Sequence, residues 1–291
     1  MHISDIIRGV VSDIIKRRDT PDFPTNLQGL DEAIWGLHKT EVLVVGGRPG
    51  DGKTSLCLQL AYEMSIKHRV VFLSLEMTKE QLVERIIAYE YMYDYFGLRK
   101  GIHKKVVQGR QDEICDKLSK HKLLIIDDMG RTPLELENCI KELSPKPDVI
   151  FIDHLQQISV RKGNRLEALD EYVRFLKTFA MKEDISVVLA SQLNRGAEED
   201  SRPHLHYIKG CGSVEEVADC VVLIWRQDNQ TSLLIEKQRH GPTGKLEVNF
   251  LKEFSKFTDK SFRQEPKDIQ REKISEEEIE KTTKLFGGEV I

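Results

Sequence analysis

The sequence predicts an α/β fold in which a mainly parallel β-sheet is covered by helices on both faces. Short apolar runs alternate with longer amphipathic stretches. Because the runs are continuously apolar, both of their faces are expected to be buried, which is typical of parallel strands between two helical layers. A phosphate-binding motif between one such run and a helical stretch favours the same fold. We expect strands at 41–46, 70–75, 123–127, 149–153, 187–191 and 220–225.

The composition excludes several classes of protein. The 291 residues suffice for one large domain or two small ones, and 44 basic against 48 acidic residues give a net charge of −4, which excludes a globally basic nucleic-acid coat. No apolar run is long enough to span a membrane and no signal peptide is recognisable, so we expect a cytoplasmic protein without a membrane partner. The cysteines share no metal-ligand spacing and are expected to be reduced thiols: Cys57, Cys115, Cys139, Cys211 and Cys220.

The chain begins with a predicted amphipathic helix. Apolar residues recur from Ile3 to Ile15 at helical spacing, and the basic residues 16–18 follow where the helix dipole favours cations. The segment 20–24 contains two prolines and cannot continue a helix. Periodicity alone is compatible with a helix on a linker and with a helix packed on its own domain.

The end of the chain predicts a hairpin followed by a charged tail. Apolar runs at 232–237 and 246–250 flank a turn signal at 240–244, which indicates a hairpin at the edge of the sheet. From residue 253 to 291 charged residues dominate, so we expect a mobile tail there, with one short helix that begins near Ser275 and ends at Gly287.

A nucleotide site is predicted directly after the first strand. The segment 47–54 matches G-x-x-x-x-G-K-[ST], and an apolar helical stretch follows it. Glycines let successive backbone N–H groups surround a phosphate, and the helix N-terminus adds partial positive charge. We expect Lys53 to reach the β- and γ-phosphates and Thr54 to bind Mg²⁺. The predicted nucleotide-binding residues are Gly47, Arg48, Pro49, Gly50, Asp51, Gly52, Lys53, Thr54 and Ser55.

Two acids compete for the role of the metal-binding carboxylate. Asp153 ends the apolar strand 149–153, and Asp127 ends an equally apolar run. A carboxylate in either place would hold Mg²⁺ directly or through water. The pattern of the strands does not decide between them.

Six segments occur in this order: GGRPGDGKTS (46–55), SLEM (74–77), FIDHLQQI (151–158), SQLNR (191–195), GCGSVEEVAD (210–219) and KQRHGPTG (237–244). Together they resemble the C-terminal motor domain of the DnaB-family replicative helicases. The likeness extends over residues 20–252, which would form the ATPase domain, and it favours Asp153 over Asp127 because the family's next motif follows Asp153 directly. The resemblance implies a RecA-like P-loop NTPase that forms a hexamer, uses ATP or another NTP with Mg²⁺, and unwinds DNA in the 5′ to 3′ direction. Residues 1–19 look like the family's linker helix, which binds the adjacent subunit.

The resemblance also assigns catalytic roles. Glu76 matches the glutamate that activates the attacking water, and Gln192 matches the γ-phosphate sensor. Lys237 and Arg239 resemble a pair that reaches the nucleotide of the neighbouring subunit, where arginine spreads charge over the transition state. With Lys53 these are the predicted catalytic residues. A surface acid at position 76 and an ordinary solvated basic turn at 237–239 are the alternatives.

DNA contacts are expected on two loops. The resemblance places Lys209, Gly210 and Gly212 on single-stranded DNA in the centre of the ring, and a second candidate loop carries Arg161, Lys162 and Arg165. Local basic charge is sufficient to bind phosphates in an acidic chain. For each basic residue a solvated surface role is the alternative.

The sequence departs from the family pattern in two segments, and one domain of the family has no counterpart in it. Glu215-Glu216-Val217 replaces an acid-amide-acid triplet, and 206–210 differs from the usual loop sequence, which puts DNA affinity and step coupling in question. The family's N-terminal collar has no counterpart, so the sequence is either a segment of a longer protein or a short helicase of phage or mobile-element type.

Two further functions compete with the autonomous helicase. One is a non-translocating RecA-like ATPase in recombination or as an assembly switch. The other is a helicase that depends on a loader. Expected partners are single-stranded DNA, forked duplex, further copies of the chain, and a helicase loader or primase.

Overall fold

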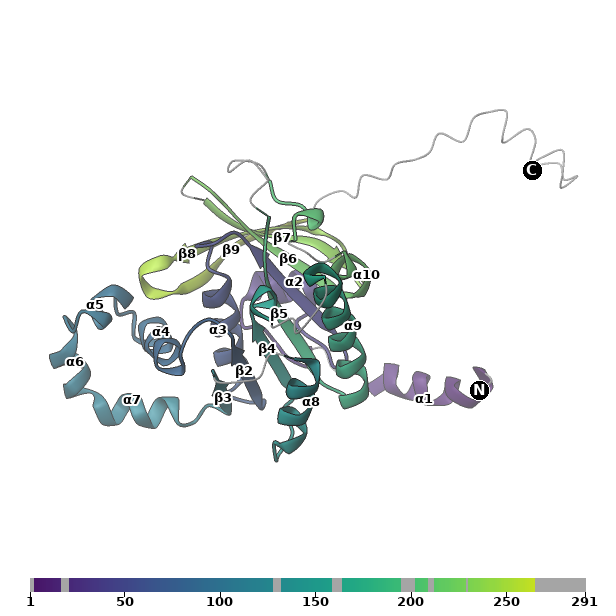
Figure 1. The fold of residues 1–291 in the computed structure, drawn as a ribbon, viewed down its shortest axis with the longest axis horizontal. Helices are drawn as coiled ribbons and strands as arrows, with labels where there is room; N and C mark the ends of the chain where they lie inside the picture. The colour runs from purple at the N-terminus through teal and green to yellow at the C-terminus, as the bar shows by residue number, and fades with distance from the viewer. Residues whose placement is uncertain are drawn as a thin grey trace, which may run out of the picture.

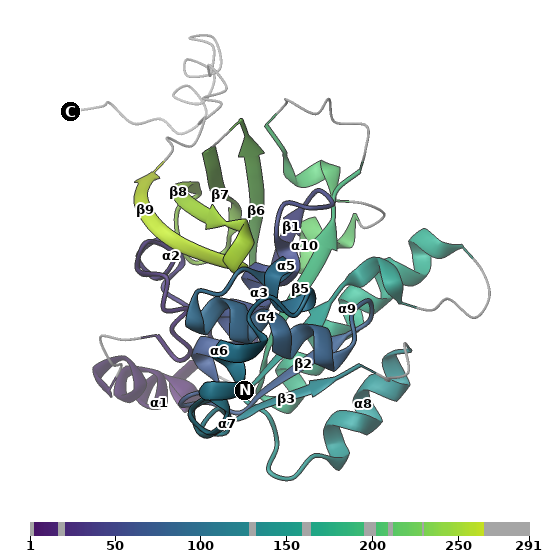
Figure 2. The same cartoon turned by 90° about the vertical axis from the view of Figure 1, so that its left-hand side faces the viewer.

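A nine-stranded sheet organises the molecule. The computed structural model describes residues 3–16, 21–127, 132–158, 164–194, 202–208, 212–228 and 230–264. The strand order is β3-β2-β4-β5-β1-β6-β7-β8-β9, and the first six are mutually parallel while β7, β8 and β9 are antiparallel. Figure 2 shows β3 at one end of the sheet and β7, β8 and β9 at the other. The predicted mainly parallel sheet is confirmed.

Eight of the nine strands, all except β9, agree closely with the apolar runs of the sequence. The central strands β1, β2, β4 and β5 are buried along nearly their whole length, which explains why the apolar runs locate them, since both faces of a central strand meet helices. The bounds are β1 Val42–Gly47, β2 Val70–Ser74, β3 Leu123–Ile126, β4 Val149–Asp153, β5 Ser186–Gln192, β6 Cys220–Gln227, β7 Gln230–Gln238, β8 Gly244–Leu251 and β9 Lys256–Gln264.

Helices cover both faces of the sheet. Alternate residues of each central strand point to opposite sides, so Phe72 and Phe151 stack in one core while Val71 and Ile150 lie in the other. The first core is closed by α2 (Gln28–Ile34), α3 (Lys53–Met64) and α4 (Lys79–Tyr91). The second is closed by α8 (Pro133–Glu142), α9 (Arg165–Glu183) and α10 (Ser213–Val217).

Short helices join these layers. Three of them form an arm between α4 and β3, at the far left of Figure 1: α5 (Tyr95–Arg99), α6 (Lys104–Gly109) and α7 (Gln111–Leu118). Single 3₁₀ turns follow the strand β4, precede α10 and precede β9: η1 (Leu155–Gln157), η2 (Leu205–Tyr207) and η3 (Lys252–Phe254). Within the described part of the chain, no helix is long and apolar enough to cross a bilayer.

The N-terminal helix α1 (Ile3–Lys16) has the predicted extent but stands apart from the sheet (Figure 1). Its apolar residues Ile3, Ile7, Val10, Val11 and Ile15 are between 47% and 78% exposed. An amphipathic helix normally buries its apolar stripe. The single chain therefore leaves this stripe uncovered.

The predicted start of the charged tail at residue 253 is wrong. The strand β9 pairs with β8, and its Phe257 is 1% exposed. The charged residues of β9 concealed the strand from the sequence pattern, although Asp259 accepts hydrogen bonds from the backbone N–H groups of Gln28 and Gly29 at 2.8 and 2.9 Å and so caps α2. Residues 265–291, which include the expected short helix, lie outside the described part of the chain.

Gln59 joins β9 to the core of the molecule. Its side-chain oxygen accepts a hydrogen bond from the Phe257 N–H at 2.8 Å, and its amide donates to the Phe257 carbonyl at 3.0 Å. Because Gln59 is buried, the substitution Gln59→Leu leaves two backbone groups without partners. We expect it to lower the free energy of unfolding by about 2 kcal/mol.

Urea denaturation followed by circular dichroism measures this loss. The matched control is Gln108→Leu on the exposed surface of α6, which should change stability by less than about 0.5 kcal/mol. Equal stability of the two variants would contradict the assignment of β9 to the core.

Candidate nucleotide-binding and active site

Four neighbouring strands bring the candidate catalytic groups to one edge of the sheet. The strands β2, β4, β5 and β1 are adjacent and parallel, so their carboxyl ends lie together. Their register places Ser74 beside Asp153, and Gly47 beside Gln192. Ligands of open α/β sheets bind beyond the carboxyl ends of strands, and the predicted residues lie there.

The loop after β1 has the backbone shape of a phosphate cradle. Gly50 and Gly52 have φ values of +84° and +101°, a conformation that L side chains rarely adopt. Asp51 fastens the loop by accepting a hydrogen bond from the Arg48 N–H at 2.8 Å. The Lys53 ammonium donates to the Arg48 carbonyl at 2.9 Å, and its burial lowers the pKa of this side chain.

A cavity of about 350 Å³ collects the predicted groups from these elements. The phosphate loop forms one wall, and the carboxyl ends of β2, β4 and β5 form another. The structure thus brings together residues that lie far apart in the sequence, and among the predicted residues that line the cavity are Lys53, Thr54, Glu76, Asp153 and Gln192.

Asp153 has the environment expected of a metal-binding carboxylate. It is 1% exposed, and neither carboxylate oxygen has a hydrogen-bond partner of good geometry in the described structure. Burial raises its pKa, and the neighbouring Thr54 hydroxyl opposes that shift. Buried carboxylates without partners are costly, and a hard cation that prefers oxygen ligands removes the cost. The donor set of Asp153 and Thr54 therefore fits Mg²⁺.

Asp127, the competing acid, lies in a different environment. It follows the edge strand β3 and accepts a hydrogen bond from the Lys79 N–H at 2.8 Å, which lowers its pKa. The Lys79 ammonium lies 3.6 Å from the Asp127 carboxylate. Asp127 does not line the phosphate cavity. The geometry favours Asp153.

Glu76 lies on a turn that the preceding strand shapes. The Ser74 hydroxyl donates to the Met77 carbonyl at 2.6 Å and accepts from the Met77 N–H at 3.1 Å, which closes the turn around Glu76. The Glu76 carboxylate projects into the cavity region with 55% of its side chain exposed, and one oxygen is 3.0 Å from Nδ1 of His154. An accessible carboxylate at the phosphate end of the site is able to accept a proton from water.

The side-chain amide of Gln156, which sequence analysis did not single out, holds the backbone of Gln192 in place. Its backbone N–H donates to the Gln156 side-chain oxygen at 2.8 Å, and the Gln156 amide donates to the Ser191 hydroxyl at 3.0 Å. The end of β5 is therefore held against η1, which follows the strand β4.

Sequence analysis missed other residues of the cavity, because their contacts join segments that lie far apart in the chain. Arg85 of α4 donates to the Ser55 hydroxyl at 3.1 Å, and its guanidinium lies 4.8 Å from the centre of the Tyr95 ring. Phe250 of β8 covers the phosphate loop so closely that a Cβ on Gly52 would come within 2.8 Å of its ring. No local pattern in the sequence marks these residues; only the cavity unites them.

Lys237 and Arg239 do not line the phosphate cavity of their own chain. They lie at the opposite edge of the sheet, since Gln238 pairs with Cys220 at the amino end of β6. Lys237 donates to the carbonyls of Glu215 and Glu216 at 2.6 and 3.3 Å. Arg239 contacts Asp219 at 3.2 Å.

The candidate DNA residues are only partly described. Gly212 precedes α10 and has open space around it. Arg165 begins α9 and donates a hydrogen bond to the Gln156 carbonyl, so it is connected to the clamp at the end of β5. Lys209, Gly210, Arg161 and Lys162 lie outside the described residues.

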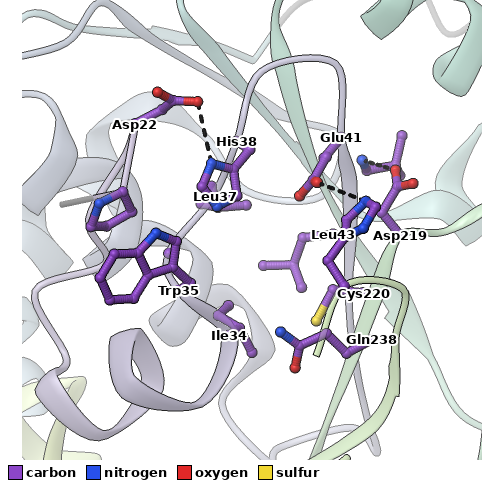
Figure 3. A pocket seen from close by; sticks show the side chains of 14 residues that line it. Asp22, Ile34, Trp35, Leu37, His38, Glu41, Leu43, Asp219, Cys220 and Gln238 are labelled. Atoms are coloured by element: carbon purple, nitrogen blue, oxygen red, sulfur yellow. Dashed lines mark hydrogen bonds and ion pairs between the residues drawn. The ribbon is translucent and has the colours of Figure 1, made fainter. Parts of the chain in front are cut away.

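A larger cavity of about 810 Å³ lies at the edge of the sheet opposite the phosphate loop (Figure 3). Asp22 and His38, which line it, form one ion pair at 3.3 Å. Glu41 and His240, which also line it, form another at 3.6 Å. It contains acids where a phosphate site needs backbone donors and cations. We therefore assign the nucleotide to the smaller cavity.

The glycine cradle, its lysine and the buried carboxylate on a neighbouring parallel strand define a P-loop nucleoside triphosphatase of the RecA-like type. Within that class the chain belongs to the DnaB-like helicase family, because the model of the DnaB-like helicase C-terminal domain matches residues 22–259.

Comparison with individual proteins agrees with this family. The chain is 33% identical over 267 residues to the replicative DNA helicase DnaB of Treponema pallidum, covering 89% of this chain and 61% of that protein. It is 32% identical over 260 residues to the replicative DNA helicase DnaC of Bacillus subtilis, covering 83% and 57%. The chain thus spans about six-tenths of the length of these relatives.

Two solved structures have the same fold. One, described as an ATPase domain, superimposes with a TM-score of 0.80 at 24% identity, covering 89% of this chain and 99% of that one. The other, a DnaB-like replicative helicase described together with its interactions with primase, gives a TM-score of 0.81 at 23% identity, covering 89% and 69%.

The choice of metal-binding carboxylate predicts a difference between two variants. We expect Asp153→Asn to weaken the Mg²⁺-dependent part of nucleotide affinity by about tenfold or more, because it removes a charge that faces the cation. Asp127→Asn should leave that affinity unchanged. Fluorescent-nucleotide titration with and without Mg²⁺ measures both, and the reverse result would assign the metal to Asp127.

Proposed function

We propose that the chain is the motor of a ring-forming DNA helicase, which couples ATP hydrolysis to translocation on single-stranded DNA and to unwinding of duplex. Family membership supports the activity. The observation that supports ring formation is that Lys237 and Arg239 lie away from the phosphate cavity of their own chain. Two cations at the far edge of the sheet complete a site only if a second copy presents its cavity to them.

Within one chain, each group has a distinct task. The backbone of the phosphate loop and Lys53 bind the phosphates, while Thr54 and Asp153 hold Mg²⁺, whose charge would neutralise the phosphate oxygens. Glu76 accepts a proton from the attacking water, and Gln192 contacts the γ-phosphate and reports its loss through the end of β5. The contribution of Glu76 as a base is of the order of 10²–10⁴ in rate.

The neighbouring copy supplies the remaining positive charge. Arg239 and Lys237 would neutralise the γ-phosphate of the adjacent subunit as charge develops in the transition state. The order of subunits around the ring is then head to tail, which closes as a hexamer when the rotation is sixfold.

The DNA is proposed to pass through the centre of the ring. Lys209, Gly210 and Gly212, which precede α10, would hold DNA phosphates, and so would Arg161 and Lys162, which precede α9, together with Arg165, its first residue. The hydrogen bond of Arg165 to the Gln156 carbonyl supports a connection between this second loop and the Gln192 clamp. Loss of the γ-phosphate is thereby linked to the position of the DNA loops.

The helix α1 is proposed to bind an adjacent copy. Its exposed apolar stripe supports this role, since burial of Ile7 and Val10 against another subunit removes apolar surface from water. Forked duplex DNA, a loader and a primase remain proposed partners, and the cytoplasm the proposed location. A RecA-like ATPase that assembles without translocating is the competing function.

Removal of the trans arginine tests the shared site. We expect Arg239→Ala to lower DNA-stimulated ATP hydrolysis by about a hundredfold or more, because the transition state loses its guanidinium. Mixing this variant with Lys53→Ala should restore part of the activity, since some interfaces then combine an intact phosphate loop with an intact arginine. Steady-state hydrolysis with a measurement of mass in solution provides both readouts.

A monomer that hydrolyses ATP at the full rate, with or without Arg239, would contradict the shared site. Turnover that does not respond to DNA would favour the assembly ATPase.

The linker helix predicts a second assembly phenotype. We expect Ile7→Glu to shift the protein from hexamers to smaller species, because it puts a charge into an interface formed by apolar side chains. Ser12→Glu, on the other side of the same helix, is the matched control. Analytical ultracentrifugation measures the distribution, and unchanged hexamers in the Ile7 variant would exclude this role of α1.

A further inference from the structure

We propose that His154 is a positioning residue that holds the Glu76 carboxylate in line with the γ-phosphate. The proposal rests on the proposed role of Glu76 as the base. It concerns a residue that the motif analysis passed over, because His154 follows the metal-binding carboxylate rather than forming part of a recognised catalytic pattern.

The contact joins a fixed group to an exposed one. Nδ1 of His154 lies 3.0 Å from Oε2 of Glu76, and the exposed fractions of the two side chains are 9% and 55%. The Nδ1–H tautomer of the imidazole donates to the carboxylate, a charge-assisted hydrogen bond. The histidine is therefore the rigid partner of the pair.

Two neighbours hold the backbone of His154. It follows Asp153, the last residue of the central strand β4, and its carbonyl accepts a hydrogen bond from the Gln157 N–H at 3.0 Å. The Leu75 N–H donates to the Asp153 carbonyl at 2.7 Å, so the turn that carries Glu76 is tied to the same peptide segment. Backbone and side chain thus connect Glu76 to β4 at two points.

The need for such a contact follows from the exposure of Glu76. Ser74 shapes the backbone of the turn, but a glutamate side chain has three further rotatable bonds and loses considerable entropy when it is held in one rotamer. A base must lie within hydrogen-bond reach of the proton that it accepts. A donor on a buried strand end restricts the carboxylate to the cavity before the nucleotide binds.

This role separates the effects on turnover and on binding. The phosphate loop and Lys53 hold the nucleotide without contacting His154 in any described hydrogen bond. Loss of the imidazole should therefore lower kcat and leave the KM for ATP and the Kd for nucleotide unchanged, which is the signature of an interaction needed only in the transition state.

The experiment compares two substitutions at residue 154 in the full chain with DNA present. His154→Leu removes the donor and is expected to lower kcat about tenfold. A small displacement of a catalytic group lowers the rate by about one to two orders of magnitude. His154→Asn retains an N–H donor near the position of Nδ1 and is expected to restore kcat to within about twofold of the wild type. Fluorescent-nucleotide titration gives Kd for each variant.

Glu76→Gln provides the reference for the proposed base. It should abolish most turnover and retain nucleotide binding, and His154→Leu should cause little further loss in that background, because a residue that acts through Glu76 has nothing left to position. Full activity of Glu76→Gln would overturn the assignment of the base itself.

The remaining outcomes bear on His154 alone. With Glu76→Gln inactive, the proposal is overturned if His154→Leu turns over like the wild type, if it loses nucleotide affinity in parallel with kcat, or if His154→Asn is as slow as the leucine variant. A drop in kcat with unchanged Kd, reversed by asparagine, supports it.

Discussion

The parallel pairing of β1 with β5 and of β2 with β4 is the constraint on which the site depends. A shift of either register by one residue would turn Asp153 or Gln192 to the other face of the sheet, because side chains alternate along a strand. The two apolar cores enforce the register, since the same shift would exchange the residues buried on each face. Packing far from the phosphates therefore determines the chemistry at the edge.

A second set of interactions lies at the amino edge of the sheet, around Asp219. Asp219 is 3% exposed and accepts hydrogen bonds from the Val42 N–H at 2.8 Å and from the Lys177 ammonium at 2.6 Å, while Arg239 lies 3.2 Å from its other oxygen. The start of β1, the middle of α9 and the proposed trans arginine thus meet at one carboxylate. The proposed trans residue belongs to a network that extends to the strand leading into the phosphate loop.

The sequence was sufficient for most of the sheet and for the phosphate-binding motif. Apolar runs located β1 to β8, most clearly for the central strands whose burial on both faces leaves a continuous signal, and the phosphate motif located Lys53 and Thr54. The strand β9 was missed because its exposed charges hide the alternation around Phe257. Arg85, Gln156 and His154 were missed for another reason: their roles arise from contacts between strands and helices that only the folded chain brings together. Of the proposed DNA contacts only Gly212 and Arg165 are described, so that part stays a prediction.

The close packing of Phe250 on Gly52 makes the phosphate loop dependent on a strand about two hundred residues further along the chain. Synthesis proceeds from the N-terminus, so the whole motif leaves the ribosome long before β8 exists. A nascent chain that ends before β8 carries every residue of the motif but lacks the wall that supports the loop. Nucleotide affinity is consequently expected to be a property of the completed domain, so an immature chain would lack a complete site for the proposed ring.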